Sequence, residues 1–463
     1  MNTLEVSSPF DGKVIGEVPL ANADGIEHAL QSAHGVYRDK SAWLPLHRRV
    51  AILDKLAGLM SERRDQLALQ AAREGGKPLK DSLVETDRAI DGVKICIEII
   101  RQNHGAVIPM GTTAASAGHR AFTQREPIGV VAAVSAFNHP LNLIVHQVVT
   151  AVAAGCPVLV KPATATALSA WSIHQMLHEA GLPEAWCQFV LPPENEQIQA
   201  MVTDERVAFL TFIGSGKVGW MLRSKLAPGT RCALEHGGVA PLFVAADADL
   251  EAAVAAITKG GYYHAGQVCV SVQRVFAEQS VARELAERIA AAAQALRVGD
   301  PAAEDTDVGP LIRPDEVERV HAWVTEATDQ GAELICGGKP LPDNCYAPTL
   351  LFDPPAEARV STEEIFGPVV CIHPYTDLAQ AIERANSLPY AFQAAVYTDS
   401  LRIAEQVFAG IDASAVMVNQ HTAFRVDGMP FAGLKRSGYG VGGMPYTIAD
   451  MQIEKMLVWN AEA

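Results

Sequence analysis

The sequence has few charged and few aromatic residues, and it lacks the features that mark metal-binding and disulfide-rich proteins. Charged residues make up 19% of the 463 residues, and aromatic residues make up 6%. The eight cysteines are scattered, no C-x-x-C pair occurs, and no histidines cluster. This spacing excludes a zinc ribbon and argues against a disulfide framework, so we expect neither a metal site nor an oxidising compartment.

No segment of the sequence predicts export or insertion into a membrane. The N-terminus lacks the basic and then apolar layout of a signal peptide. The longest apolar stretch, 143–160, is interrupted by His146, Gln147 and Pro157. The 37 Lys and Arg against 53 Asp and Glu give a net charge of −16, which repels nucleic acids and anionic membrane surfaces. We therefore expect a cytoplasmic protein with no nucleic-acid or membrane partner.

What the sequence does contain is an alternation of short β-branched runs with longer, alanine-rich amphipathic stretches. Apolar residues make up 49% of the chain, enough for a large core, and the length suggests about three domains or lobes at roughly 150 residues each. The alternation predicts an α/β fold with mainly parallel strands. Predicted strands lie at 129–135, 157–161, 207–213 and from 242, and predicted helices at 48–74, 80–100, 143–154, 167–180, 250–262 and 281–296. A last strand is predicted at 451–459, and pairing across a subunit interface is one possibility for it.

A glycine motif follows the predicted strand at 207–213. Gly214, Gly216 and Gly219 form G-x-G-x-x-G at the start of a predicted helix, where backbone N–H groups can hold a pyrophosphate. A glycine turn with no ligand is the alternative. The usual rule would assign Glu235, some 20 residues further on, to the cofactor's ribose.

Cys269 lies between an alanine- and glycine-rich helix and an apolar strand. A cysteine nucleophile needs a partly open site, nearby amide donors and a group that lowers its pKa. The alternative is a small buried hydrophobic residue. Glu235 precedes Gly237 and Gly238, which permit a close approach of a ligand or of another backbone; taken alone, it reads as a turn residue.

Together, seven motifs resemble the aldehyde dehydrogenase superfamily in order and spacing, over roughly residues 5–460. They are Phe137-Asn138-His139-Pro140, Lys161-Pro162-Ala163, Gly214-Ser215, Glu235-His236-Gly237-Gly238, Gly266-Gln267-Val268-Cys269, Glu364-Ile365-Phe366-Gly367-Pro368 and Pro430-Phe431-Ala432-Gly433-Leu434-Lys435-Arg436-Ser437-Gly438. The resemblance implies a Rossmann-type cofactor domain (1–105 and 128–237), an α/β catalytic domain (238–431) and a small β oligomerisation arm (106–127 and 440–463). It also implies a homodimer or homotetramer.

The resemblance implies three catalytic residues. Cys269 would attack the aldehyde to give a thiohemiacetal, and Asn138 with the Cys269 backbone N–H would form the oxyanion hole. After hydride transfer leaves a thioester, Glu235 would activate the water that hydrolyses it. Glu235 is therefore assigned as the base and not as the ribose ligand.

The resemblance also implies an NAD or NADP site. Lys161 would contact the adenosine ribose, and Ser215, between Gly214 and Gly219, the pyrophosphate. Glu364 and Phe366 would hold the nicotinamide ribose, with Phe137 nearby. Strongly NAD-preferring members carry a glutamate where this chain has Thr164, which neither binds the 2′-hydroxyl in that way nor repels a 2′-phosphate. We therefore expect both cofactors to bind, with a slight preference for NADP.

The substrate is expected to be a small anionic aldehyde. Segments 137–146 and 419–427 resemble the branch of phosphonoacetaldehyde dehydrogenase, close to non-phosphorylating glyceraldehyde-3-phosphate and lactaldehyde dehydrogenases. Arg88, His139 and Arg425 match its anion-binding positions. Members that bind phosphoryl or phosphonate groups carry an arginine directly before the nucleophile, but here Val268 makes that wall of the mouth apolar. A carboxylate or sulfonate would suit two arginines better than a dianion would.

Several alternatives stay open. Arg88 and Arg425 would be surface or interdomain ion pairs in a member that acts on an uncharged aldehyde such as lactaldehyde. A member that transfers the acyl group to coenzyme A would, in our interpretation, lack Glu235. A non-catalytic member would typically lack the cysteine or the glutamate, and this chain has both.

Overall fold

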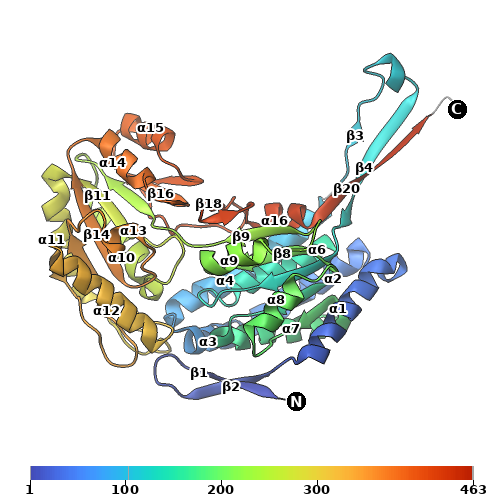
Figure 1. The fold of residues 1–463 in the computed structure, drawn as a ribbon, viewed down its shortest axis with the longest axis horizontal. Helices are drawn as coiled ribbons and strands as arrows, with labels where there is room; N and C mark the ends of the chain where they lie inside the picture. Colours follow the sequence, from blue (N-terminus) through green and yellow to red (C-terminus); the bar gives the residue numbers. More distant parts are fainter. Residues whose placement is uncertain (1, 103, 461–463) are drawn as a thin grey trace.

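The computed structural model describes residues 2–102 and 104–460. Figure 1 shows two α/β lobes, with a β-arm that projects from one of them and carries the C-terminal strand. In the described residues, no helix combines the length and the apolar content needed to cross a membrane.

The first lobe is built on a six-stranded sheet with the order β19-β9-β8-β5-β6-β7. All neighbours are parallel except β19 and β9. The strands are β5 (Val130–Val134), β6 (Val158–Lys161), β7 (Cys187–Phe189), β8 (Val207–Ile213), β9 (Arg231–Glu235) and β19 (Gly438–Tyr439). The predicted strands at 129–135, 157–161 and 207–213 are therefore confirmed as β5, β6 and β8.

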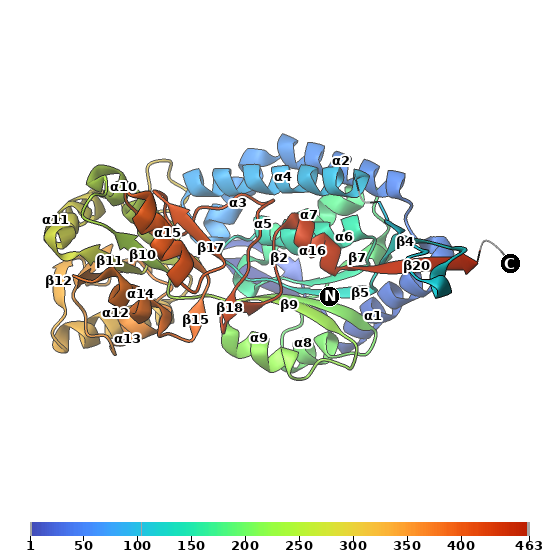
Figure 2. The ribbon, with the colours of Figure 1, turned by 90° about the horizontal axis from the view of Figure 1, so that it is seen from above.

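Helices cover both faces of this sheet, as the two views together show (Figure 2). Alternate residues of β5 belong to two separate cores: Val131 and Ala133 to one, Val130 and Ala132 to the other. This explains why the strand is apolar throughout, since a strand buried on both faces has no polar side. One face packs against α2 (Leu46–Glu62), α3 (Arg64–Gly75), α4 (Leu79–Arg101), α6 (Thr150–Ala154), α7 (Ala167–Glu179) and α16 (Met444–Asp450), and the other against α1 (Ala23–Arg38), α8 (Asn195–Val202) and α9 (Gly216–Arg223).

Two of the helix predictions for this lobe need correction. The predicted helix at 48–74 is two helices, because the backbone at Arg63 (φ −106°, ψ 16°) leaves the helical region between α2 and α3. The predicted helix at 143–154 is α5 (Asn142–Ile144) and α6, joined by a π-helical turn at Val145–Val149. Such wide turns often occur at functional sites. Neither break carries a proline or glycine that would mark it in the sequence.

The second lobe contains a seven-stranded sheet with the order β12-β13-β14-β11-β10-β16-β17, parallel except between β12 and β13. Its strands are β10 (Pro241–Val244), β11 (Arg274–Glu278), β12 (Glu333–Cys336), β13 (Thr349–Phe352), β14 (Val369–Tyr375), β16 (Gln393–Tyr397) and β17 (Ala415–Val418). Its helices are α10 (Leu250–Tyr262), α11 (Gln279–Ala295), α12 (Pro314–Asp329), α13 (Arg359–Thr362), α14 (Leu378–Asn386) and α15 (Leu401–Gly410). The predicted helices at 250–262 and 281–296 match α10 and α11.

The arm is a three-stranded antiparallel sheet of β3 (Val107–Ile108), β4 (His119–Pro127) and β20 (Gln452–Asn460). The C-terminal strand β20 pairs along its whole length with β4 of the same chain, from Gln452 opposite Pro127 to Asn460 opposite His119. The possible pairing across a subunit interface is therefore not needed to give β20 a partner. The remaining strands form small ribbons: β1 (Thr3–Ser7) with β2 (Val14–Pro19), and β15 (Tyr390–Ala391) with β18 (Leu434–Lys435).

Candidate active site

The loop that carries Cys269 leaves α10 through a strained turn. His264 and Ala265 have positive φ angles of 52° and 53°, a conformation that costs about 1–3 kcal/mol at each non-glycine residue. A side chain at the following Gly266 would collide with the backbone carbonyl of Gly367. The turn delivers Cys269 to a half-buried position.

Asn138 lies beside this loop. Its side-chain nitrogen Nδ2 donates to the carbonyl of Gln267, at 3.0 Å, and the side chain is buried. Gln267 is itself fixed, because its Nε2 donates to the carbonyl of Pro310 and its Oε1 accepts from the N–H of Ile312. An amide nitrogen carries two hydrogens, so one N–H of Asn138 remains for a ligand next to Cys269.

Glu235 is the last residue of β9, and its charge acts on Cys269. Burial raises the pKa of its carboxyl group, and the nearby charge of Arg425 acts in the opposite direction. A Cβ atom at Gly442 would collide with Glu235 Oε1, so the glycine leaves room for this carboxylate. A carboxyl group of raised pKa in a partly dry site is suited to proton transfer near neutral pH.

The electrostatics of Cys269 differ from the sequence expectation. Burial, with the negative charges of Glu235 and Glu364, raises the pKa of this thiol to about 12. Arg425 acts in the opposite direction but does not outweigh them. This direction is opposite to the lowered pKa that a reactive cysteine needs, so the thiol form of Cys269 is favoured in the free protein. The same interactions show that Glu235, Glu364 and Arg425 each lie within electrostatic reach of Cys269.

The glycine motif lies at the start of α9, directly after β8. The N–H of Gly214 donates to the carbonyl of Glu235, so the turn is tied to the strand that carries the candidate base. Ser215 is the residue before the first turn of α9. At Gly219 a side chain would collide with the ring of His236, so this third glycine is needed for close packing of the helix on β9.

Glu364 and Phe366 lie on the second lobe and face the first. The ring of Phe366 contacts that of Phe137 edge to face, with centroids 5.9 Å apart. Glu364 packs against Gly237 so closely that a side chain there would overlap the carboxylate. Its Oε1 is buried and has no hydrogen-bond partner in the part of the chain that the structure describes, and burial raises the pKa of the carboxyl group to about 8. An orphaned buried carboxylate oxygen fits a ligand hydroxyl such as that of a ribose.

A small cavity separates Glu364 and Phe366 from the Cys269 loop. Val268 points to this side: it is 5% exposed, and it lines the cavity together with Gly238, Gly266, Ser271, Gln273, Glu364, Phe366, Gly367 and Val369. Gln273 fixes the segment that carries Glu364. Its Nε2 donates to the carbonyls of Val360 and Glu363, and its Oε1 accepts from the N–H of Ile365.

Lys161 and Thr164 lie at the end of β6. Lys161 is half-buried, burial lowers the pKa of its ammonium group, and that group forms no hydrogen bond or ion pair with any described residue. Thr164 is exposed three residues further on. A half-buried lysine without a protein partner fits a polar ligand at this edge of the sheet.

Arg88, on α4, forms a two-bonded ion pair with Asp427. Nε and Nη2 of Arg88 donate to the two carboxylate oxygens, at 3.0 and 2.8 Å. The alternative interpretation of Arg88 as an ion pair between distant segments is therefore realised. It does not exclude contact with a ligand, since the side chain is 28% exposed.

Arg425 and His139 have a different environment. The guanidinium of Arg425 lies 3.7 Å from the ring centroid of Phe431 and forms no hydrogen bond among the described residues. His139 is hydrogen-bonded through Nε2 to the hydroxyl of Tyr263, at 3.2 Å. Burial and the charges of Lys77, Arg88 and Arg425 hold the pKa of His139 well below its usual value, so this imidazole is neutral.

Four residues of this region were missed by the sequence analysis: Asp427, Tyr263, Gln267 and Gln273. Asp427 is two residues beyond Arg425, and its burial was not predictable from one sequence. The glutamines flank Cys269 at −2 and +4, but a polar residue beside a candidate nucleophile gives no sign of which distant segment it will bind.

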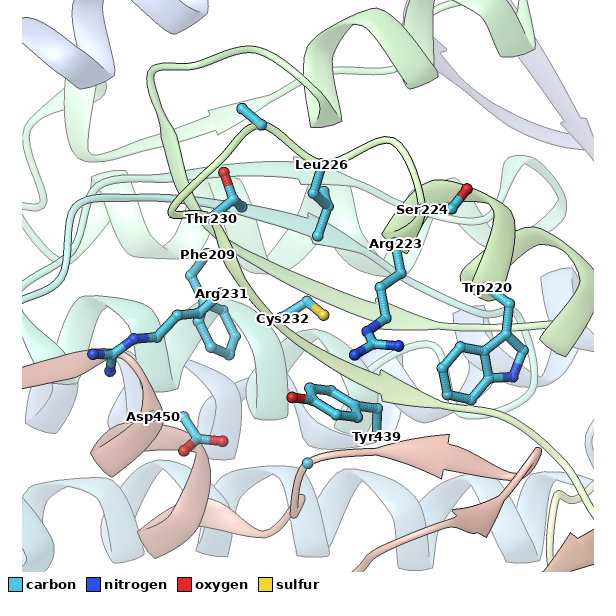
Figure 3. Close-up of a pocket in the computed structure, with 12 residues that line it drawn as sticks. Phe209, Trp220, Arg223, Ser224, Leu226, Thr230, Arg231, Cys232, Tyr439 and Asp450 are labelled. Carbon is cyan, nitrogen blue, oxygen red and sulfur yellow. The ribbon is translucent and has the colours of Figure 1, made fainter.

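A second cavity, of about 640 Å³, lies away from Cys269. In Figure 3 the side chain of Arg223 points between Trp220 and Tyr439, and the guanidinium lies 4.1 Å from the ring centroid of Tyr439. None of the residues assigned a role from the sequence lines this cavity. The candidate active site is therefore the region around Cys269.

Comparison with known proteins gives full-length matches. A sequence model described as the aldehyde dehydrogenase family matches residues 1–457. A 3-sulfolactaldehyde dehydrogenase of Priestia aryabhattai is 35% identical, covering 99% of this chain and 95% of its own. Two crystal structures are similar. Aldehyde dehydrogenase 21 from Physcomitrella patens, in complex with the reaction product succinate, has a TM-score of 0.95 and 34% identity, over 99% of this chain and 95% of its own. A glyceraldehyde-3-phosphate dehydrogenase from Methanocaldococcus jannaschii, complexed with NADP, has a TM-score of 0.93 and 32% identity, over 99% of both chains.

Proposed function

The chain belongs to the aldehyde dehydrogenase family and oxidises aldehydes with NAD or NADP, and we propose that its substrate is a small anionic aldehyde, of the sulfo-, carboxy- or phosphonoacetaldehyde-like kind. The observation that carries this proposal is Arg425: its guanidinium has no hydrogen-bond partner among residues 2–102 and 104–460, and its charge reaches Cys269. The fold predicted from the motifs, with two α/β lobes and a β-arm, is confirmed by the similarity to solved structures.

The proposed reaction starts at Cys269. Its sulfur adds to the aldehyde carbon, and the resulting oxyanion accepts hydrogen bonds from Asn138 Nδ2 and the Cys269 backbone N–H. NAD(P)⁺, when bound, accepts the hydride that leaves this carbon. Cys269 then carries a thioester. Glu235 removes a proton from water, the hydroxide adds to the thioester, and the thiolate of Cys269 leaves as the carboxylic acid is released.

The thiol form of Cys269 can enter this series of reaction steps if its proton moves to a neighbouring base before the sulfur attacks. Glu235 is that neighbour, and burial already raises its pKa. The same carboxylate would then act twice: it takes the thiol proton, releases it to solvent, and as a carboxylate again takes a proton from water. In the proposed function Glu235 therefore serves both half-reactions.

The cofactor would lie across the carboxyl edge of the six-stranded sheet. Lys161 would bind the adenosine ribose, the N–H groups at Gly214–Gly219 the pyrophosphate, and Glu364 the nicotinamide ribose, with Phe366 and Phe137 beside it. Thr164 leaves room for a 2′-phosphate beside Lys161, which supports NADP as well as NAD. The NADP bound to the Methanocaldococcus relative is consistent with this proposal.

The substrate's charged group would lie near Arg425 and Arg88, with neutral His139 and Tyr263 at its side. The relative named for 3-sulfolactaldehyde and the relative crystallised with succinate both handle acidic compounds. These names support a sulfonated or carboxylated aldehyde for this chain. Glu235 supports release of the free acid and argues against transfer to coenzyme A.

We include self-association and the domain boundaries in the proposal. The oligomerisation arm would comprise 106–127 and 440–463. Its strands β4 and β20 present an exposed apolar surface, with Phe122, Met456, Leu457 and Trp459 each 38% to 54% exposed. An exposed apolar strand edge needs a cover, and a second copy in a homodimer or homotetramer would supply it. The cofactor domain would comprise 1–105 and 128–237, and the catalytic domain 238–431. The eight free cysteine thiols support a cytoplasmic location.

The proposal is tested by initial rates of NADPH and NADH formation over a panel of sulfoacetaldehyde, succinate semialdehyde, phosphonoacetaldehyde, lactaldehyde and propionaldehyde. We expect at least one anionic aldehyde to exceed propionaldehyde tenfold in kcat/KM. Cys269→Ala should abolish turnover, whereas Cys232→Ala, a half-buried cysteine in the second cavity, should not. Equal rates with propionaldehyde would refute the substrate class, and activity in Cys269→Ala would refute the mechanism.

A further inference from the structure

Asp427 holds together three segments beside Arg88 and Arg425, where the charged group of the proposed substrate would lie. Besides the two bonds from Arg88, it accepts from Asn142 Nδ2 at 2.9 Å and from His146 Nε2 at 2.7 Å. Asp427 is 3% exposed, so its charge is met by protein and not by water. His146 reaches it from the π-helical turn, which the sequence analysis did not predict.

Only one of these three partners brings a compensating charge. Burial and the charge of Arg425 lower the pKa of His146 to about 4, although the bond to Asp427 opposes this. His146 therefore donates as a neutral imidazole at physiological pH, and Asn142 donates as a neutral amide. The negative charge of Asp427 is balanced by Arg88.

Arg425 is then the cation of this group that no described carboxylate contacts directly, although the charge of Glu235 acts on it. It forms no hydrogen bond among the described residues, and its charge acts on Cys269, Glu235, Asp427 and Arg88. The other charged pair nearby, Lys77 with Glu85, is buried and internally neutral. His139 and His264 both have pKa values held well below the usual one by burial, so they add no charge.

We infer that Asp427 is a specificity-determining residue: by binding Arg88 and cancelling its charge, it limits the mouth to substrates whose acidic group carries a single negative charge. This inference rests on the proposed function. The single positive charge of Arg425 would pair with the single negative charge of a sulfonate or carboxylate. Arg88 would add a hydrogen bond but little net charge. A phosphonate dianion would bring a second charge that no free cation meets.

The test compares Asp427→Asn with the unmodified enzyme at saturating cofactor, at a pH at which phosphonoacetaldehyde is a dianion. The readout is the ratio of kcat/KM for phosphonoacetaldehyde to that for sulfoacetaldehyde. We expect a ratio of 0.1 or less in the unmodified enzyme and a rise of about tenfold in Asp427→Asn, roughly the effect of one unpaired charge. Asp91→Asn, an exposed position on the same helix as Arg88, changes the net charge equally and should leave the ratio unchanged.

Two further variants separate charge from structure. Arg88→Gln leaves Asp427 unbalanced and should lower the ratio below that of the unmodified enzyme. The double variant Arg88→Gln/Asp427→Asn leaves Arg425 alone and should return the ratio to near its original value. Arg88→Gln also serves as the test if Asp427→Asn fails to fold.

An unchanged ratio in folded Asp427→Asn, or in Arg88→Gln, would overturn the inference and leave Asp427 with a purely structural role. Failure of the proposed function has a different signature, because it is measured against propionaldehyde in the unmodified enzyme. If propionaldehyde equals both anions there, the substrate class is refuted. The two outcomes therefore do not depend on the same comparison.

Discussion

The negative charge of Glu235 raises the pKa of the Cys269 thiol, adding to the larger effect of burial. Glu235, the candidate base, thus lowers the fraction of Cys269 that is ionised as long as its carboxylate is charged. This relationship has a measurable sign, because removing the charge must lower the thiol pKa.

For Glu235→Gln we predict faster alkylation of Cys269 by iodoacetamide at a fixed pH, since a larger fraction of the thiol ionises. Steady-state turnover should fall by about 10²–10⁴-fold because the base is lost. Alkylation rates against pH, followed by mass spectrometry at Cys269, give the shift directly. Glu205→Gln, an exposed glutamate, is the control. An unchanged alkylation profile would show that the two groups do not interact.

For Thr164→Glu we predict a change in cofactor choice. A carboxylate at this exposed position beside Lys161 would repel a 2′-phosphate and accept a hydrogen bond from a 2′-hydroxyl. The kcat/KM for NADP should fall at least tenfold, while that for NAD should stay equal or rise. Thr203→Glu, at the end of α8, controls for the added charge. A parallel loss with both cofactors would place the adenosine ribose elsewhere.

Gly237→Ala and Gly35→Ala form a matched pair. An added methyl group at Gly237 would overlap the Glu364 carboxylate, whereas nothing lies within 4 Å of the same group at Gly35 on α1. We expect Gly237→Ala to raise the KM for the cofactor severalfold, because Glu364 must move. Gly35→Ala should stabilise the protein by about 0.5–1 kcal/mol without changing kinetics. Cofactor titrations and thermal melts check both, and equal kinetics in the two variants would contradict the geometry.

Gln273→Leu should weaken both stability and cofactor binding. The change leaves the carbonyls of Val360 and Glu363 and the N–H of Ile365 without their bonds, at about 1–3 kcal/mol for each group that stays buried. Urea unfolding measures the loss, and the KM for NADP reports the displacement of Glu364. Gln175→Leu, exposed on α7, should change neither. A loss of stability with an unchanged KM would show that Gln273 does not position Glu364.

Much of the fold was predictable because its main strands are buried on both faces and are almost entirely apolar. Val130–Val134 and Val207–Ile213 show this, and α10 was predicted with its observed ends. The break at Arg63 and the π-helical turn at Val145–Val149 were not, because both are set by packing and neither has a local signal.

The candidate site also contains residues that the sequence could indicate and contacts that it could not. Cys269, Glu235 and Asn138 stand in short motifs, so a sequence can point to them, although their roles remain predictions. The partner of Arg88 is 339 residues away in the chain, and no local pattern links it to Asp427. The raised pKa of Cys269 also escaped prediction, because it depends on how much water the folded loop excludes.

The pairing of β20 with β4 and of β19 with β9 has a consequence for synthesis on the ribosome. The six-stranded sheet of the first lobe and the sheet of the arm each take a strand from residues 438–460. These strands, β19 and β20, come more than 200 residues after the strands with which they pair, β9 and β4. A growing chain must therefore hold β4 and β9 with one edge uncovered until translation is nearly complete. Since uncovered strand edges template aggregation, the first lobe and the arm stay prone to misfolding until residues 438–460 are made, and a chain that stops early never covers these edges.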